Sequence, residues 1–256
     1  MSEAIAMFEA RGASVSYGAL RALEGVDLQV QRGEQVALIG PSGAGKSTLL
    51  SLRNAFRSPD EGDVHVLGRD LAGGSLRRRR QVQRRVGTVG QQFDLAGQLR
   101  VVHNVNAGHL GNWSLWRAAV SLLAPRDVEG AREALRQVGL EGKLFERTDR
   151  LSGGEQQRVA IARVLVQEPW AILADEPIAS LDPTRGTEVI DPLLALGQKL
   201  GTTLVVSLHD VDVALARFER VVALREGRVT YDGSPADLRE GFISDLYATE
   251  RGTHTA

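Results

Sequence analysis

The chain has 256 residues, a length that fits one large α/β domain with room for a small subdomain. It carries 31 basic and 32 acidic side chains, and the formal net charge of −1 argues against a nucleic-acid-binding protein, which usually shows a basic excess. It contains no cysteine, which excludes disulfides, thiolate metal sites and cysteine catalysis. No stretch approaches the ~20 apolar residues that cross a bilayer, and the N-terminus lacks the pattern of a secretory signal. We therefore expect a cytosolic protein that reaches a membrane only through a partner.

Short β-type runs dominate the first part of the chain, and turn residues such as Gly25 separate them. The predicted strands are Ala13–Tyr17, Val26–Val30, Val36–Ile39 and Val64–Leu67.

After residue 40 the helical and β-type patterns alternate, which indicates a parallel sheet with helices packed on it. The predicted helices are Lys46–Asn54, Asp127–Val138 and Glu155–Val166, and the predicted strands are Val86–Val89, Ala171–Ala174 and Thr203–Ser207. The last two strands are nearly all apolar, which is typical of strands covered on both faces. Residues of about 92–150 lack β-runs and predict a helical insertion, whereas Val221–Tyr231 returns to β character.

A phosphate-binding motif follows the strand Val36–Ile39 and opens a helix. The stretch Gly40–Thr48, which we call the phosphate loop, matches G-x-x-x-x-G-K-[ST]; its residues are Gly40, Pro41, Ser42, Gly43, Ala44, Gly45, Lys46, Ser47 and Thr48. Glycines let backbone N–H groups approach phosphate oxygens, and the helix start favours an anion. We expect Lys46 to reach the β- and γ-phosphates, Ser47 to bind Mg²⁺ and Thr48 to contact the α-phosphate. The loop alone leaves kinases, GTPases and ATPases open.

Two carboxylates follow the apolar strand Ala171–Ala174. Asp175 is predicted to lie at the end of the sheet beside the phosphate loop, where it holds Mg²⁺ directly or through water. Glu176, one residue further, is placed to accept a proton from an attacking water. The alternative is a pair of acids that begins a helix at a strand end.

A second anion-binding helix start lies at Leu151–Glu155. Its small residues Ser152, Gly153 and Gly154, here called the signature turn, leave N–H groups free at the helix start. One triphosphate needs only one cradle, so we predict that this turn serves the nucleotide of another subunit. Ser152 also fits a local role as N-cap, with Glu155 as its capping-box partner, and the two roles are compatible.

These motifs, in this order, resemble those of the ATP-binding-cassette ATPases over residues of about 8–240. The matching segments are Gly40–Thr48 (Walker A), Gln91 (Q-loop), Leu151–Glu155 (the LSGGE signature), Leu173–Glu176 (Walker B), Ser180–Asp182 (D-loop) and His209 (switch histidine). The resemblance implies an α/β P-loop NTPase with a RecA-like parallel-sheet core, an N-terminal antiparallel β subdomain and an inserted helical subdomain. The implied boundaries are 8–91 and 151–240 for the core, 92–150 for the helical subdomain and 241–256 for a C-terminal tail.

The resemblance also implies catalytic roles. Glu176 would be the general base, and His209 would contact the γ-phosphate and orient that base. Gln91 would sense Mg²⁺ and the attacking water, alongside the metal-binding residues Ser47 and Asp175. His209 also fits a core or capping histidine. The family usually carries phenylalanine where this chain has Gly90, a departure that leaves the glutamine assignment open between Gln91 and Gln92.

Nucleotide contacts follow from the same resemblance. Tyr17 would stack on adenine, although it also fits a plain strand aromatic. Ser152 and Gly154, with Gly153 between them, would close on the γ-phosphate of the opposite subunit. Asp182 would lie across the interface of the two copies. The implied cofactors are ATP and Mg²⁺.

One ATPase unit without a membrane span is typical of bacterial importers, in which two such subunits lie beneath two permease subunits. The stretches Gln91–Leu95, Asn104–Arg117, Glu176–Pro183 and Ser207–Asp212 are similar to the phosphonate-importer branch. The resemblance thus implies a homodimer at the cytoplasmic face of the membrane, bound to permeases and indirectly to a solute-binding protein. Alternatives are an importer ATPase for another small solute, a soluble repair or translation ATPase, and an ATP-binding module without turnover.

A basic run, Arg77–Arg80 with Arg84 and Arg85, invites a membrane-surface or nucleic-acid interpretation. We interpret it instead as the solvated face of a helix that precedes the strand Val86–Val89.

Overall fold

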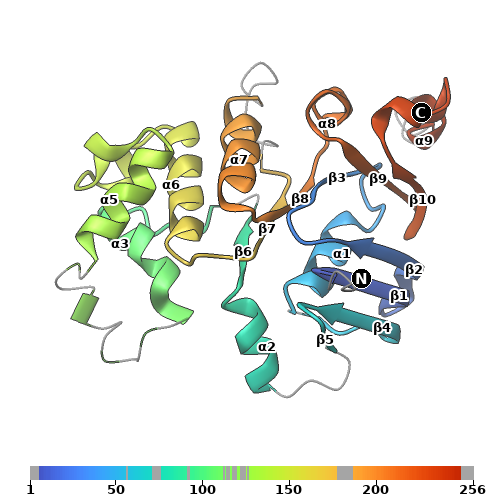
Figure 1. The fold of residues 1–256 in the computed structure, drawn as a ribbon, viewed down its shortest axis with the longest axis horizontal. Coiled ribbons are helices and arrows are strands. Elements are labelled where there is room, and N and C mark those ends of the chain that lie inside the picture. Colours follow the sequence, from blue (N-terminus) through green and yellow to red (C-terminus); the bar gives the residue numbers. More distant parts are fainter. Residues whose placement is uncertain are drawn as a thin grey trace, which may run out of the picture.

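Two β-sheets organise the chain (Figure 1). The computed structural model describes residues 6–55, 57–70, 76–90, 93–111, 113, 116, 120–121, 125, 127–177 and 187–248. The first sheet is antiparallel with strand order β2-β1-β4-β5, and its strands are β1 (Phe8–Tyr17), β2 (Leu20–Val30), β4 (Glu61–Val66) and β5 (Arg69–Asp70). The predicted N-terminal antiparallel β subdomain is therefore confirmed.

The second sheet has strand order β10-β9-β3-β8-β7-β6. Its strands are β3 (Gln35–Ile39), β6 (Val86–Val89), β7 (Ala171–Asp175), β8 (Thr203–Ser207), β9 (Arg220–Arg225) and β10 (Arg228–Gly233). All neighbours are parallel except β10, which forms an antiparallel hairpin with β9. The parallel-sheet core is thus confirmed, and the predicted β-region at the end of the chain divides into two strands at Glu226 and Gly227, both with positive φ.

The parallel sheet is buried on both faces. In β3, Val36 and Leu38 pack into a core shared with the antiparallel sheet and α1 (Lys46–Arg53). The alternate residues Ala37 and Ile39 face a second core, which the helices on the other side cover. Since successive side chains of a strand point to opposite faces, a strand covered on both sides is apolar throughout.

The inserted segment is helical where the structure describes it. Its elements are α3 (Val101–Asn106), α5 (Val128–Gln137) and the 3₁₀ turns Ala107–Gly111, Glu141–Lys143 and Thr148–Arg150. They pack with α6 (Gly153–Leu165) at the end of the molecule beyond β6, away from the antiparallel sheet (Figure 1). The remaining helices are α2 (Leu76–Gln83), α7 (Thr187–Leu200), α8 (Val211–Arg217) and α9 (Phe242–Leu246), with a 3₁₀ turn at Pro235–Asp237. The exact subdomain boundaries stay a prediction.

The basic run divides between α2 and the turn after it. Arg77 and Arg80 are exposed on α2, as predicted for a solvated helix face. Arg85 lies beyond the helix, and its guanidinium carbon stands 5.1 Å from the centre of the Trp170 ring. Across the described ranges, no helix is both long enough and apolar enough to cross a membrane.

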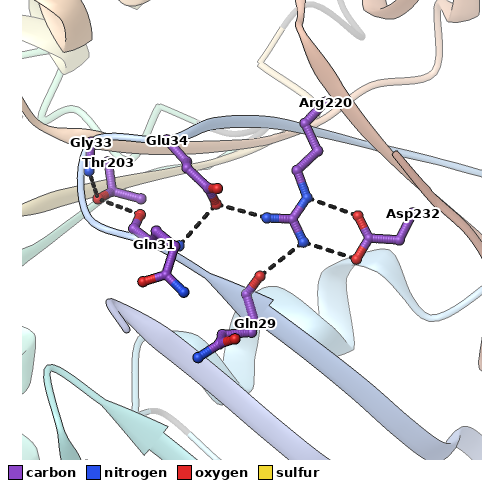
Figure 2. Close-up of polar contacts among 7 residues, drawn as sticks. All are labelled: Gln29, Gln31, Gly33, Glu34, Thr203, Arg220 and Asp232. Carbon is purple, nitrogen blue, oxygen red and sulfur yellow. Dashed lines mark hydrogen bonds and ion pairs between the residues drawn. The ribbon is translucent and has the colours of Figure 1, made fainter. Parts of the chain in front are cut away.

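Arg220 joins the two sheets at the edge shown in Figure 2. Its guanidinium bonds both carboxylate oxygens of Asp232 on β10 at 2.8 Å, and Glu34 beside β3 at 2.7 Å. It also donates to the carbonyl oxygen of Gln29 on β2 at 2.8 Å. The hydrogen bonds to Asp232 raise the pKa of Arg220 above its ordinary value. One cation therefore ties strands of both sheets together.

We expect Arg220→Met to lower the free energy of unfolding by about 1–3 kcal/mol, because two carboxylates and a carbonyl lose their donor. The matched control is Arg11→Met, which removes a mostly exposed arginine paired with its neighbour Glu9 and should cost less than about 1 kcal/mol. Urea unfolding of both variants measures the difference. Equal losses of unfolding free energy in the two variants would show that the Arg220 network stabilises the fold no more than an exposed ion pair does.

Candidate nucleotide and catalytic site

The phosphate loop leaves the parallel sheet at the end of β3 and leads into α1. Gly40 has a φ of +147°, and a side chain there would place its Cβ 2.1 Å from the carbonyl oxygen of Leu224. Gly45 has a φ of +103°, and its Cβ would lie 2.5 Å from the carbonyl oxygen of Ala22. Both positions therefore require glycine. At Gly43 the φ is +77°, but an added Cβ meets no atom within 4 Å, so the space beside the loop is open there.

Lys46 is the cation of the loop and is only 4% exposed. Its Nζ donates to the carbonyl oxygens of Gly40 at 2.7 Å and Pro41 at 3.2 Å, and lies 3.9 Å from the Glu176 carboxylate. Gly45, the N-cap of α1, provides no side-chain cap for the first N–H groups of the helix. A buried ammonium and an uncapped helix start thus meet at one loop, which favours an anion.

The other predicted loop residues surround this centre. Ala44 is buried, and its carbonyl oxygen accepts a hydrogen bond from the Gly227 N–H at 3.1 Å. Ser42 and Ser47 are exposed, and Thr48 is half-buried in the first turn of α1. The loop therefore presents its hydroxyls outward while its backbone is held against the β9–β10 hairpin.

Asp175 ends β7 beside the phosphate loop, as the sequence predicts. Its Oδ1 accepts hydrogen bonds from the Ser47 hydroxyl at 3.1 Å and from the Ser207 hydroxyl at 2.6 Å. Asp175 pairs with Ser207 in the register of β7 and β8. The carboxylate is therefore held from two sides.

The donor set around Asp175 fits Mg²⁺. A carboxylate and a hydroxyl are the hard oxygen ligands that this ion prefers, and it usually completes its shell with phosphates and water. Within the parts of the chain that the structure describes, no group of three or more His, Asp or Glu could hold a metal unaided.

Glu176 lies in a left-handed backbone conformation with a φ of +46°, which is unusual for a residue other than glycine. Its N–H donates to the Ser207 hydroxyl at 2.8 Å and to the Ser207 carbonyl oxygen at 3.2 Å. Ser207 therefore contacts both acids, Asp175 through the side chain and Glu176 through the backbone. No sequence motif pointed to Ser207 as a site residue; the one available signal is a hydroxyl at the end of the apolar run Thr203–Ser207.

His209 reaches the phosphate loop two residues after β8. Its Nε2 lies 3.3 Å from the Ser42 hydroxyl, and the imidazole is exposed. The structure therefore brings His209 to the same edge of the sheet as Lys46 and Glu176 rather than into the core.

Tyr17 ends β1 and is 48% exposed. The guanidinium carbon of Arg57 stands 4.2 Å from the centre of its ring, a cation–π contact. Tyr17 pairs with Leu20 at the tip of the β1–β2 hairpin, and Ala22 of the same hairpin abuts Gly45. The predicted adenine-stacking residue thus lies on the hairpin that packs against the phosphate loop.

The signature turn begins α6 with a complete capping box. The Ser152 hydroxyl accepts from the Glu155 N–H at 3.3 Å, and the Glu155 carboxylate accepts from the Ser152 N–H at 2.8 Å. The latter bond is the main cause that lowers the pKa of Glu155. A Cβ added at Gly153 or Gly154 meets no atom within 4 Å. The predicted capping role is confirmed, and the two glycines face open space.

The signature turn and the phosphate loop do not share a site within one chain. Helix α6 lies with α3 and α5 at one end of the molecule, whereas α1 lies on the other side of the parallel sheet (Figure 1).

Two side chains connect α6 to the rest of the site. Buried Gln157 donates to the carbonyl oxygen of Pro177, next to Glu176. Arg163 donates to the carbonyl oxygens of Phe93 and Asp94, each at 2.9 Å. Burial lowers the pKa of Arg163. Neither side chain has a role that the sequence predicts.

Three residues with roles suggested by the family resemblance lie outside the described residues: Gln91, Gln92 and Asp182.

A groove of about 960 Å³ separates the parallel sheet from the inserted helical segment. Its lining includes Arg80 of α2, Arg84 of the following turn and Thr88 of β6, together with Leu110 and Trp113 of the inserted segment.

The model of the ABC transporter family matches residues 23–179, which are more than half of the chain. The phosphonates import ATP-binding protein PhnC of Anaeromyxobacter dehalogenans (strain 2CP-C) is 50% identical over 242 residues, which cover 94% of this chain and 48% of that protein. The protein of the same name from Pseudomonas fluorescens (strain Pf0-1) is 47% identical over 232 residues, which cover 91% and 88%. The chain thus spans about half the length of the first relative and most of the second.

Solved cassettes share the fold. A dimeric ATP-binding cassette in a post-hydrolysis state, bound to ADP and Pi, has a TM-score of 0.73 and 31% identity, covering 90% of this chain and 99% of that one. CbiO1 from Clostridium perfringens, part of an ABC transporter complex, has a TM-score of 0.79 and 28% identity, covering 98% and 96%. These likenesses confirm the predicted fold class.

We expect Ser207→Ala to lower the free energy of unfolding by about 1–3 kcal/mol, because the Glu176 N–H and the Asp175 carboxylate both lose the buried hydroxyl. The control is Ser51→Ala, which removes only a local bond to the Thr48 carbonyl in α1 and introduces a better helix former. Chemical denaturation should show a loss for Ser207→Ala alone. A wild-type stability for Ser207→Ala would contradict the bridging role.

Proposed function

The chain belongs to the ABC transporter family, and from that premise we propose that it is the ATP-hydrolysing subunit of a bacterial import complex. Its cargo is a phosphonate or a related phosphorus oxyanion. The observation that carries the proposal is the convergence of Lys46, the Ser47–Asp175 pair and Glu176 at one edge of the parallel sheet. The cargo is supported by relatives that are 43–50% identical and named for phosphonate import.

Lys46 and Glu176 act together in the proposed mechanism. Lys46 donates to the loop carbonyls and lies 3.9 Å from the Glu176 carboxylate. When the triphosphate binds, Lys46 turns to its β- and γ-oxygens, which frees Glu176 to accept a proton from the attacking water. His209 contacts the γ-phosphate from the Ser42 side, and Gln91 senses the metal and that water. Ser47 and Asp175 would hold Mg²⁺, which would supply positive charge to the phosphates.

The two anion-binding helix starts support a dimer with composite sites. Within one chain, the signature turn lies away from the phosphate loop, and its glycines face open space. In the proposed homodimer, Ser152, Gly153 and Gly154 of one copy close on the γ-phosphate held by the other, and Asp182 lies across the interface. Tyr17 stacks on adenine.

The groove beside the helical segment supports a permease contact. It runs between the sheet and the inserted helices. Arg163 of α6 lines this groove and donates to the carbonyl oxygens of Phe93 and Asp94, which closely follow Gln91 in the sequence. We place the permease's cytoplasmic helices in this groove, which holds the chain at the cytoplasmic face of the membrane. The solute-binding protein then acts only through the permease.

We expect Glu176→Gln to retain ATP binding and to lower the ATP turnover of the chain with its permease by about 10²–10⁴, the usual contribution of a general base. A strain that carries this variant as its only copy should fail to grow on a phosphonate as sole phosphorus source and should still grow on phosphate. The matched control is Glu168→Gln, the same change on the exposed turn before the opposite end of β7. If Glu176→Gln leaves ATP turnover unchanged, Glu176 is not the general base. If turnover is lost but the strain still grows normally on the phosphonate, only the proposed cargo is refuted.

Composite sites predict complementation between two inactive variants. Lys46→Ala removes the cation of the phosphate loop. Gly154→Asp places a negative charge at the signature turn, where the open space tolerates a side chain. Each homodimer should be inactive. Mixed chains should recover activity, because a heterodimer pairs the intact cradle of one copy with the intact signature turn of the other. ATPase assays of equimolar mixtures measure this, and no recovery would argue for sites built within one chain.

A further inference from the structure

Tyr247, which follows α9, contacts the first residue of the phosphate loop. Its hydroxyl oxygen accepts a hydrogen bond from the Gly40 N–H at 2.9 Å, across 207 positions of sequence. The carbonyl oxygen of Gly40 accepts from Lys46 Nζ at 2.7 Å. Side chains from two distant parts of the chain therefore hold the two backbone groups of Gly40.

Contacts of three α9 residues hold the helix in the position that brings the Tyr247 hydroxyl to Gly40. Leu246 is buried in the core beneath the parallel sheet, and the Phe242 ring packs against Tyr231 of β10 at 5.5 Å between centroids. Arg225 donates to the carbonyl oxygen of Asp245 at 2.8 Å. Arg225 follows Leu224, whose carbonyl oxygen lies close to Gly40. The end of β9 therefore contacts both Gly40 and helix α9, which carries Asp245.

We propose that Tyr247 is a positioning residue for ATP binding: it holds the start of the phosphate loop in its binding conformation and so couples the C-terminal helix to the nucleotide site. The inference rests on the proposed function for the identity of the nucleotide. When Lys46 turns from Gly40 to the phosphates, the hydrogen bond from the Gly40 N–H to the Tyr247 hydroxyl remains and still holds Gly40. A loop held in place before binding loses less conformational freedom when the ligand arrives.

Tyr247→Phe tests the role because it keeps the ring and removes only the hydroxyl. We expect the Kd for ATP·Mg²⁺, measured by titration calorimetry, and the KM for ATP to rise about three- to tenfold, the usual worth of one hydrogen bond. The kcat at saturating ATP should stay within about twofold of wild type, and the melting temperature should change little. Amide exchange in the nucleotide-free phosphate loop should become faster.

The matched control is Tyr231→Phe, which makes the same change on β10, where the hydroxyl donates to the carbonyl oxygen of Ser234. It should leave the Kd and KM unchanged. The proposal is overturned by a wild-type Kd in Tyr247→Phe, by an equal shift in Tyr231→Phe, or by a fall in kcat and stability without a shift in Kd. Wild-type protein that binds ATP but does not hydrolyse it would sink the proposed function and leave the Kd comparison valid. Wild-type protein that binds no ATP would sink both.

Discussion

The register of three parallel strands determines the chemistry at the carboxyl edge of the sheet. Ser207 at the end of β8 pairs with Leu38 of β3 on one side and with Asp175 of β7 on the other. The phosphate loop begins two residues after Leu38, and Glu176 follows Asp175 directly. A shift of one residue in the pairing of β7 with β8 would turn the Ser207 hydroxyl away from Asp175, because successive side chains of a strand face opposite ways.

This register is stable because the sheet is covered on both faces. Alternate side chains of β3, β7 and β8 enter two separate cores, one shared with α1 and the antiparallel sheet and the other with the helices of the insertion. The Arg220 network ties the antiparallel sheet to β9 and β10, and it also holds Glu34, which directly precedes β3 (Figure 2). Rigid strands thus support loops that carry the reactive groups, the usual division between scaffold and function.

The phosphate-binding residues and the signature turn lie in different parts of the molecule. The phosphate loop, both acids and His209 gather at one edge, whereas the signature turn begins a helix on the far side of the sheet. Gln157 connects the two regions through the Pro177 carbonyl. A movement of α6 would therefore reach the residue after the proposed base, which offers a physical path between the inserted helices and catalysis.

Local pattern was sufficient for the buried strands and for the motifs. Val86–Val89 and Thr203–Ser207 have the predicted bounds, and the capping box at Ser152 is present as expected. Prediction was poorer for β2, which begins at Leu20 instead of Val26. Its first half includes charged and exposed residues, and it is held by pairing with β1 rather than by its own apolar pattern.

The sequence by itself determined the fold class, the phosphate loop and the strand that carries Asp175 and Glu176, because these depend on residue type and short spacing. Only the tertiary structure decided that Ser207 joins the two acids and that Tyr247 meets Gly40. Such contacts link residues 31 to 207 positions apart. Strand register and helix docking bring them together, and no local pattern encodes a distance of that kind.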